Sequence, residues 1–116
     1  MLFFCEFLWL ADFFLYRGMK QYLIHAFDAK DKNALKRRMA VREKHFDLVG
    51  TLKRQGSFIY GGAILNEAGN MIGSNMVLQF ETDLDFENYL ASEPYVVNKI
   101  WRKIKVYPFK LAIVEP

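Results

Sequence analysis

One long segment with helical periodicity, residues 32–55, constrains the fold of this chain more than any other feature. Its apolar side chains recur at steps of three and four, which gathers them along one side of an α-helix, while most charged side chains fall elsewhere. Two neighbouring rows form this apolar stripe: Leu35, Met39, Arg42, Phe46, Val49 and Lys53 in one, and Arg38, Val41, His45, Leu48 and Leu52 in the other. A stripe of this kind must pack on another element, so we expect His45 to face the interior of the fold.

Two interpretations of His45 follow from its place in the stripe. A buried histidine that hydrogen-bonds a neighbouring carbonyl or hydroxyl group is the more common use of such a position. An imidazole also titrates near neutral pH, so His45 is a candidate general acid or base. The helix alone leaves both interpretations open.

Composition limits the remaining possibilities. A chain of 116 residues forms one domain with a single core. It has one cysteine and no group of cysteines and histidines at metal-ligand spacing, so we expect no internal disulfide, no metal, no cofactor and a reducing, cytoplasmic location. The net charge is +3, and nine of the sixteen basic residues fall between Lys30 and Arg54. This distribution is typical of a solvated helix face, with an anionic ligand or nucleic acid as the alternative.

Residues 1–18 differ from the rest of the chain. Fourteen of the first sixteen residues are apolar or aromatic, yet Glu6 and Asp12 interrupt the run, which leaves it too short and too acidic for a membrane span. It also lacks the basic start and the small-residue cleavage site of a secretory signal. We therefore expect residues 1–18 to be a hydrophobic N-terminal extension outside the fold, and residues 19–116 to form the domain. A membrane anchor in residues 1–18 is the alternative.

Four β-strands are predicted from runs of β-branched and aromatic residues. They cover residues 22–27, 57–65, 71–80 and 101–110. The second contains Gly61 and Gly62, a pair that indicates either a β-bulge or a close approach of another group to the backbone. Thr82 and Asp85 have the spacing of a capping box and predict a second helix through Leu90.

Alternation along residues 71–80 predicts which side of the sheet meets the helices. The mostly apolar set comprises Ile72, Ser74, Met76, Leu78 and Phe80, and the opposite set comprises Met71, Gly73, Asn75, Val77 and Gln79. We therefore expect Ser74 on the same side of the sheet as His45. In the last strand we expect Ile104 and Val106 to point inward and the alternating lysines to point outward.

The predicted elements follow the order strand, helix, strand, strand, helix, strand. This is the split βαβ pattern of a ferredoxin-like α+β sandwich, in which four antiparallel strands carry both helices on one face. The other face would be uncovered, and an exposed apolar sheet face favours a homodimer.

Six segments are distinctive in their order and spacing: YLIHAF, VREKHFDLV, IYGGAI, the pair Gly73-Ser74, SEPYVVNKIW and VYPFK. On these segments the chain resembles the YciI-like (YCII-related) family, within the wider group of dimeric α/β barrels. The match covers nearly all of residues 20–110. The resemblance implies a ferredoxin-like fold that dimerises through its sheet faces into an α/β barrel.

The resemblance also implies a site. The family carries a histidine on the first helix, an acid just before a Pro-Tyr pair and a nearby serine, and these positions fall on His45, Glu93 and Ser74. The family usually has aspartate at the acidic position, so the additional methylene of Glu93 changes the reach of the carboxylate. Arg42, one turn before His45, would hold an anionic group of the substrate or pair with Glu93, and a plain surface ion pair is the alternative.

General acid–base chemistry of the lyase or isomerase type, on a small aromatic or lactone-like molecule, is the function that such a site implies. A Ser-His-Glu nucleophilic triad lacks support, because the sequence has no nucleophile elbow and no oxyanion-hole motif. The alternative is a non-catalytic dimeric module that binds a small ligand or a protein partner, and the sequence does not decide between them. RNA binding is not expected, since residues 71–80 lack the aromatic pattern of an RNA-binding sheet.

Overall fold

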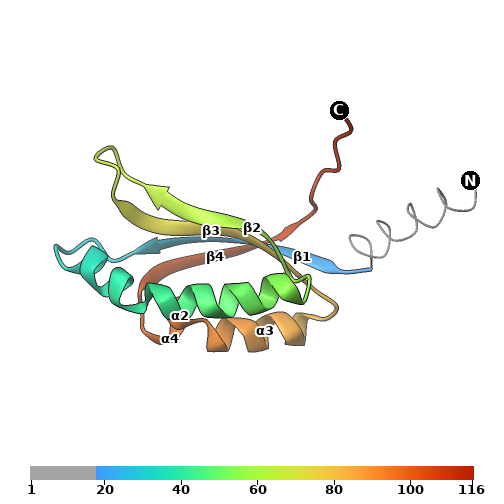
Figure 1. Ribbon diagram of the computed structural model, residues 1–116, viewed down its shortest axis with the longest axis horizontal. Helices are drawn as coiled ribbons and strands as arrows, with labels where there is room; N and C mark the ends of the chain where they lie inside the picture. Colours follow the sequence, from blue (N-terminus) through green and yellow to red (C-terminus); the bar gives the residue numbers. More distant parts are fainter. Residues whose placement is uncertain (1–17) are drawn as a thin grey trace, which may run out of the picture.

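The computed structural model describes residues 18–116 (Figure 1). Residues 1–17, and with them nearly all of the expected N-terminal extension, lie outside the described residues. The described elements are β1 (Lys20–Asp28), α2 (Ala34–Arg54), β2 (Phe58–Leu65), β3 (Met71–Phe80), α3 (Asp83–Ser92), α4 (Pro94–Val97) and β4 (Trp101–Phe109). No helix between residues 18 and 116 is long and apolar enough to cross a membrane.

The four strands form one antiparallel sheet in the order β2-β3-β1-β4. Figure 1 shows α2, α3 and α4 along one face of this sheet, whereas no described element covers the opposite face. The two central strands pair in the register that sets Ile24 opposite Met76, so both side chains lie on the helix side. This is the ferredoxin-like α+β architecture predicted from the order of the elements.

The core lies between the sheet and the helices. Met76, Leu78 and Phe80 of β3 are buried there, as the alternation along this strand predicted. Tyr22 of β1 stacks on Phe86 of α3 with ring centroids 4.1 Å apart, which joins the two layers. Burial of a large apolar side chain stabilises a fold by roughly 1.5–3 kcal/mol, so the helix-facing side of β3 contributes a substantial part of the stability.

Helix α2 uses only part of its predicted stripe for packing. Its buried residues are Arg38, His45, Val49 and Leu52. Met39 and Phe46, which the stripe also includes, are about half exposed. An α-helix has about 3.6 residues per turn, so the residues that directly follow Arg38 and His45 point away from the line of contact. The stripe predicted from the sequence is therefore wider than the contact that the rest of the fold makes with it.

The apolar residues Ile104 and Val106 of β4 point inward as predicted, but they are only partly buried. Ile104 and Val106 pair with Ala26 and Ile24 and so lie on the helix side of the sheet. They are nevertheless 37% and 39% exposed. Because β4 is an edge strand, and α2 and α3 pack mainly against β2 and β3, the helices leave this edge partly uncovered.

Two capping residues set the starting points of the helices α3 and α4, which lie between β3 and β4 in the chain. The hydroxyl oxygen of Thr82 accepts a hydrogen bond from the N–H of Asp85 at 3.1 Å, as the capping-box spacing predicted, and α3 begins at the next residue. Glu93 separates α3 from α4, and Pro94 is the first residue of α4. This break between the two helices sets the position of the Glu93 side chain.

Candidate functional site

Glu93 occupies the break between α3 and α4. Proline is favoured as the first residue of a helix and pushes the residue before it into an extended conformation, and Glu93 accordingly has φ −62° and ψ 120°. Its side chain is completely buried, and its Oε1 atom lies 2.6 Å from Nδ1 of His45 on α2. The histidine and the acid predicted for the site are thus in direct contact, and the glutamate side chain spans the gap between the helices.

Three donors surround the Glu93 carboxylate. The hydroxyl of Tyr89 donates to Oε2 at 2.5 Å, and the N–H of Tyr95 donates to Oε1 at 3.2 Å. Since carboxylate oxygens accept, Nδ1 of His45 is the third donor, and the neutral imidazole then carries its lone pair on Nε2. Burial and the adjacent Glu93 carboxylate raise the pKa of Tyr89 far above its ordinary value, which keeps its hydroxyl a donor.

Aromatic rings fix the orientation of His45. Its ring stacks on Tyr95 with centroids 4.1 Å apart and an interplanar angle of 16°, and Trp101 meets it edge-on at 6.2 Å. The His45 residue is 8% exposed and borders a cavity. Within the described part of the chain, Nε2 has no hydrogen-bond partner, so this nitrogen is free to meet a ligand.

A second buried network lies beside this pair. Nη1 of Arg38 donates to both carboxylate oxygens of Asp28 at 3.0 and 3.1 Å, and Nη2 donates to Ser74 Oγ at 2.7 Å. Nε1 of Trp101 donates to the same serine oxygen at 3.1 Å. Burial raises the pKa of Asp28, and the charge of Arg38 opposes that rise. The network joins β1, β3 and β4 to α2.

Both networks border one cavity of about 180 Å³. Its lining residues are Arg38, Arg42, His45, Phe46, Val49, Phe58, Gly61, Gly62, Ala63, Met71, Ser74, Met76 and Tyr95. Arg38 among them is paired with Asp28, whereas Arg42 has no ion-pair partner within residues 18–116 and no acidic residue lines the cavity, so this lining favours an anionic or electron-rich ligand. Within residues 18–116, no group of three or more histidine, cysteine or acidic side chains is suited to a metal ion.

The glycine pair of β2 forms part of the cavity wall. The pairing register of β2 with β3 shifts between Phe58 and Tyr60, just before the pair, as in a β-bulge. A Cβ atom on Gly61 would lie 3.0 Å from Cγ of Met76 and 3.1 Å from the Phe58 ring, so a side chain is disfavoured there. Both interpretations of the pair, a bulge nearby and a close approach to the backbone, therefore apply.

Ser74 and Arg42 line the cavity with His45, but neither forms a hydrogen bond or an ion pair with His45 or Glu93. Ser74 hydrogen-bonds Arg38 and Trp101, with no bond to His45. The Arg42 guanidinium lies over the Phe46 ring, with Cζ 4.3 Å from the centroid. Among residues 18–116, Arg42 forms no ion pair with Glu93 or with any other acidic residue, and its contact with an anionic group of a substrate stays a prediction.

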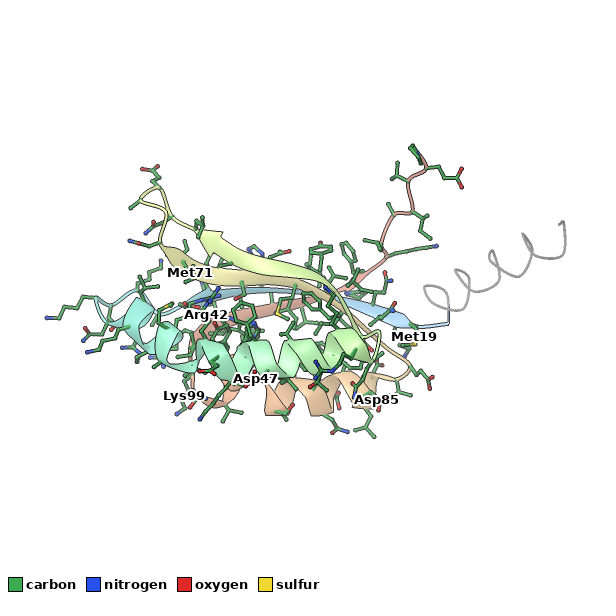
Figure 2. The ribbon with its side chains drawn as sticks, viewed as in Figure 1. Met19, Arg42, Asp47, Met71, Asp85 and Lys99 are labelled. Atoms are coloured by element: carbon green, nitrogen blue, oxygen red, sulfur yellow. The ribbon has the colours of Figure 1, made fainter. Side chains whose placement is uncertain are left out.

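Figure 2 shows Arg42 and Met71 at the end of the molecule that carries the β2–β3 loop. The Arg42 side chain reaches from α2 toward the sheet, and both residues border the cavity. The cavity therefore lies between the helix layer and the sheet, close to this end of the fold.

Three buried polar residues of the site were not predicted from the sequence to belong to it: Arg38, Asp28 and Tyr89. Arg38 carries a detectable signal, since a charged residue inside an apolar stripe requires a buried partner. Asp28 follows the alternation of β1 onto the helix side, which is where such a partner would lie. Tyr89 offers no comparable signal, because a tyrosine on the inner face of a helix is typical of packing.

The chain is similar in sequence and in structure to several known proteins. It matches the YCII-related domain family over residues 21–110. An uncharacterised protein of Haemophilus influenzae is 32% identical over 95 residues, which are 77% of this chain and 95% of that protein.

Two solved structures share the fold. One is a 5-chloro-2-hydroxyhydroquinone dehydrochlorinase from Burkholderia phenoliruptrix in complex with 2,5-dihydroxybenzoquinone, with a TM-score of 0.67, 18% identity, and coverage of 79% of this chain and 95% of that one. The other is a dimeric ferredoxin-like protein of unknown function from Thermobifida fusca, with a TM-score of 0.52, 17% identity, and coverage of 83% and 94%. At these identities the likeness establishes the fold alone.

Proposed function

The chain belongs to the family of YCII-related domains, and from this premise we propose that it is a small-molecule enzyme of the lyase or isomerase type in which His45 transfers a proton. The observation that carries the proposal is the 2.6 Å contact between Oε1 of Glu93 and Nδ1 of His45, a residue that borders the cavity. Glu93 fixes the tautomer, so that Nε2 presents its lone pair to the ligand.

The step assigned to His45 is removal of a proton from an acidic C–H or O–H group. Nε2 takes the proton, while Nδ1–H stays hydrogen-bonded to Glu93, so the imidazolium that forms faces a buried carboxylate. The negative charge left on the ligand is offset by the cationic lining, to which Arg42 contributes. Return of the proton to another atom completes an isomerisation, and departure of a leaving group completes an elimination.

A substrate built on a single ring suits this cavity. A cavity of about 150 Å³ accommodates benzene, and the cavity here measures about 180 Å³ with Phe46 and Phe58 among its walls. The dehydrochlorinase with the same fold acts on a hydroxylated ring. Loss of hydrogen chloride from such a ring needs a base for the proton, which is the role proposed for His45.

The test measures turnover in a His45→Asn variant against a panel of hydroxylated single-ring compounds, beginning with chloride release from 5-chloro-2-hydroxyhydroquinone. Loss of a general base lowers a rate by about 10²–10⁴-fold, and we expect a loss of this size with a melting temperature close to that of the unchanged protein. His25→Asn is the matched control, because His25 lies on the opposite face of the sheet and hydrogen-bonds Asn75. A folded His45→Asn protein with full turnover would overturn the proposal.

The alternative function, a non-catalytic ligand-binding module, has its own support in the packing of His45. The ring is almost completely buried and stacks on Tyr95, as a core residue would. In that case His45→Asn would unfold or loosen the domain, and no compound of the panel would be turned over. The melting temperature and the turnover measured on the same preparation therefore distinguish the two functions.

A further inference from the structure

Ser74 differs from the other groups of the cavity because both of its acceptor positions are filled. Its Oγ atom accepts from Nη2 of Arg38 at 2.7 Å and from Nε1 of Trp101 at 3.1 Å. A serine hydroxyl has two lone pairs and one hydrogen, so two donors leave it only its O–H to offer. No acceptor for this hydrogen lies within bonding distance among residues 18–116, and the side chain borders the cavity.

Arg38, which donates to the Ser74 hydroxyl oxygen, is itself held in place by its own contacts. Arg38 is 3% exposed, and its Nη1 atom contacts both oxygens of Asp28. Its guanidinium also lies over the Tyr95 ring, with Cζ 4.7 Å from the centroid. The orientation of Ser74 is therefore fixed before a ligand arrives, and the adjacent positive charge strengthens its O–H as a donor.

Donors exceed acceptors around the cavity. Nε of Arg38 is buried and has no partner within the described chain. Arg42 adds a second guanidinium, and no acidic residue is among the lining side chains. A site with this composition is completed by a ligand that brings an acceptor oxygen, and a negatively charged oxygen gains most from it.

We infer that Ser74 is the hydrogen-bond donor to an oxyanion on a single-ring ligand, with Arg38 as the positioning residue that commits the hydroxyl to donation. The inference rests on the proposed function in that it uses the same cavity, and it names the ligand class as a planar ring bearing a phenolate-like oxygen. Ser74 is not a nucleophile in this arrangement, because both lone pairs of its oxygen are engaged by N–H donors.

The test compares two probes that differ by one ionised oxygen, 4-nitrophenolate and nitrobenzene. Calorimetry gives the dissociation constant of each probe for the full chain, at a pH where the phenol is ionised. We expect the unchanged protein to bind 4-nitrophenolate more tightly than nitrobenzene. A hydrogen bond to a charged group corresponds to about a ten- to hundredfold change in affinity, so Ser74→Ala should lower the preference for the phenolate by this factor and leave nitrobenzene binding unchanged.

The ratio of the two constants is the readout, because partial unfolding weakens both probes equally and cancels. Ser74→Thr keeps a hydroxyl and should retain the preference. Arg38→Met should lower it as Ser74→Ala does, whereas Arg38→Lys, which keeps a cationic donor beside Asp28, should largely retain it. If Arg38→Met fails to fold, Arg38→Lys and the serine variants still decide the result.

Two results would overturn the inference: a preference for nitrobenzene in the unchanged protein, or an unchanged ratio in a folded Ser74→Ala variant.

His45→Asn separates this inference from the proposed function. That variant should lose turnover yet keep the phenolate preference, because the preference depends on Ser74 and not on the base. Full turnover in His45→Asn together with a Ser74-dependent preference would remove the proposed function and leave the oxyanion site standing.

Discussion

Each oxygen of the Glu93 carboxylate has its own hydrogen-bond donors. Oε1 accepts from Nδ1 of His45 and from the N–H of Tyr95, while Oε2 accepts from the Tyr89 hydroxyl. A carboxamide cannot reproduce this pattern, because one of its two ends is a donor. Replacing one carboxylate oxygen of Glu93 therefore disturbs at least one of these hydrogen bonds.

We expect Glu93→Gln to impair proton transfer by at least about 100-fold. An amide N–H₂ that faces Nδ1 forces His45 into the other neutral tautomer, whereas the reversed amide turns the Tyr89 hydroxyl into an acceptor. Either orientation removes the carboxylate charge that stabilises the imidazolium formed during proton transfer. Nitrogen-15 NMR of the His45 ring reports the tautomer directly. Glu87→Gln, on the exposed side of α3, is the control and should match the unchanged protein. A Glu93→Gln protein with the original tautomer and rate would show that Glu93 does not orient His45.

Tyr89 and Tyr22 make the stability of the fold sensitive to alkali. Burial, reinforced by the hydrogen bond to Asp83, raises the pKa of Tyr22 to about 12, and burial beside Glu93 raises the pKa of Tyr89 further. In the unfolded chain a tyrosine ionises near pH 10, at about its ordinary pKa. The unfolded state therefore releases these protons first, so stability that is present below about pH 10 is lost as the pH rises through the folded pKa values.

We expect the urea concentration at the midpoint of unfolding to fall steadily from about pH 10 to about pH 12. Tyr89→Phe should reduce this slope, because the unfolded variant has one tyrosine fewer to ionise. At neutral pH the same variant should lose about 1–3 kcal/mol, since Glu93 is left buried with one donor fewer. Unfolding curves of both proteins across this pH range provide the measurement, and identical slopes would contradict the role of Tyr89.

At the scale of elements, β3 meets β1 so closely at Gly73 that the residue type is constrained. A Cβ atom there would collide with the carbonyl oxygen of Ala26, an atom of the β1 backbone that cannot move aside without breaking the pairing. We expect Gly73→Ala to destabilise the domain by about 1–3 kcal/mol or more, as overpacking does. Gly62→Ala is the matched control, because its Cβ would meet nothing within 4 Å, and its effect should stay within about 0.5 kcal/mol. Urea unfolding of both variants compares them, and equal stabilities would refute the steric argument.

The elements were predictable because local patterns decide them. The alternation of β3 and the capping residue Thr82 act over a few neighbouring residues, and both predictions hold in the structure. The exposure of Met39 and of Ile104 was not predictable in the same way. It depends on how far the helix layer extends over the sheet, which no single segment of the chain encodes.

The site was predictable in part. Periodicity placed His45 and Ser74 on facing layers, but Glu93 came only from the family resemblance. Arg38 and Ser74 are 36 positions apart, and His45 and Glu93 are 48 apart, so their hydrogen bonds follow from tertiary packing. A sequence pattern indicates that a charged side chain such as Arg38 needs a partner, and the fold alone says which partner it has.

At the scale of the whole molecule, the face of the sheet opposite the helices carries large apolar side chains. Tyr107 pairs with Leu23, and Tyr60 pairs with Val77, all on the side away from the core. The two tyrosines are 45% and 42% exposed. A face of this kind is typical of an interface between copies of a chain, and in Figure 1 no element of residues 18–116 lies over it.

We expect the protein to be a homodimer that pairs through this face of the sheet. Homodimer interfaces of ordinary size bury at least about 1,200 Å² and exclude unpaired charges from their centre. Tyr107→Lys adds a charge beside Lys103 and Lys105, so it should convert the dimer into a monomer in size-exclusion chromatography with light scattering. Val97→Lys, at a side chain that is 60% exposed on α4 in the helix layer, should leave the dimer intact. A monomer in the unchanged protein, or a dimer that survives Tyr107→Lys, would contradict pairing through this face of the sheet.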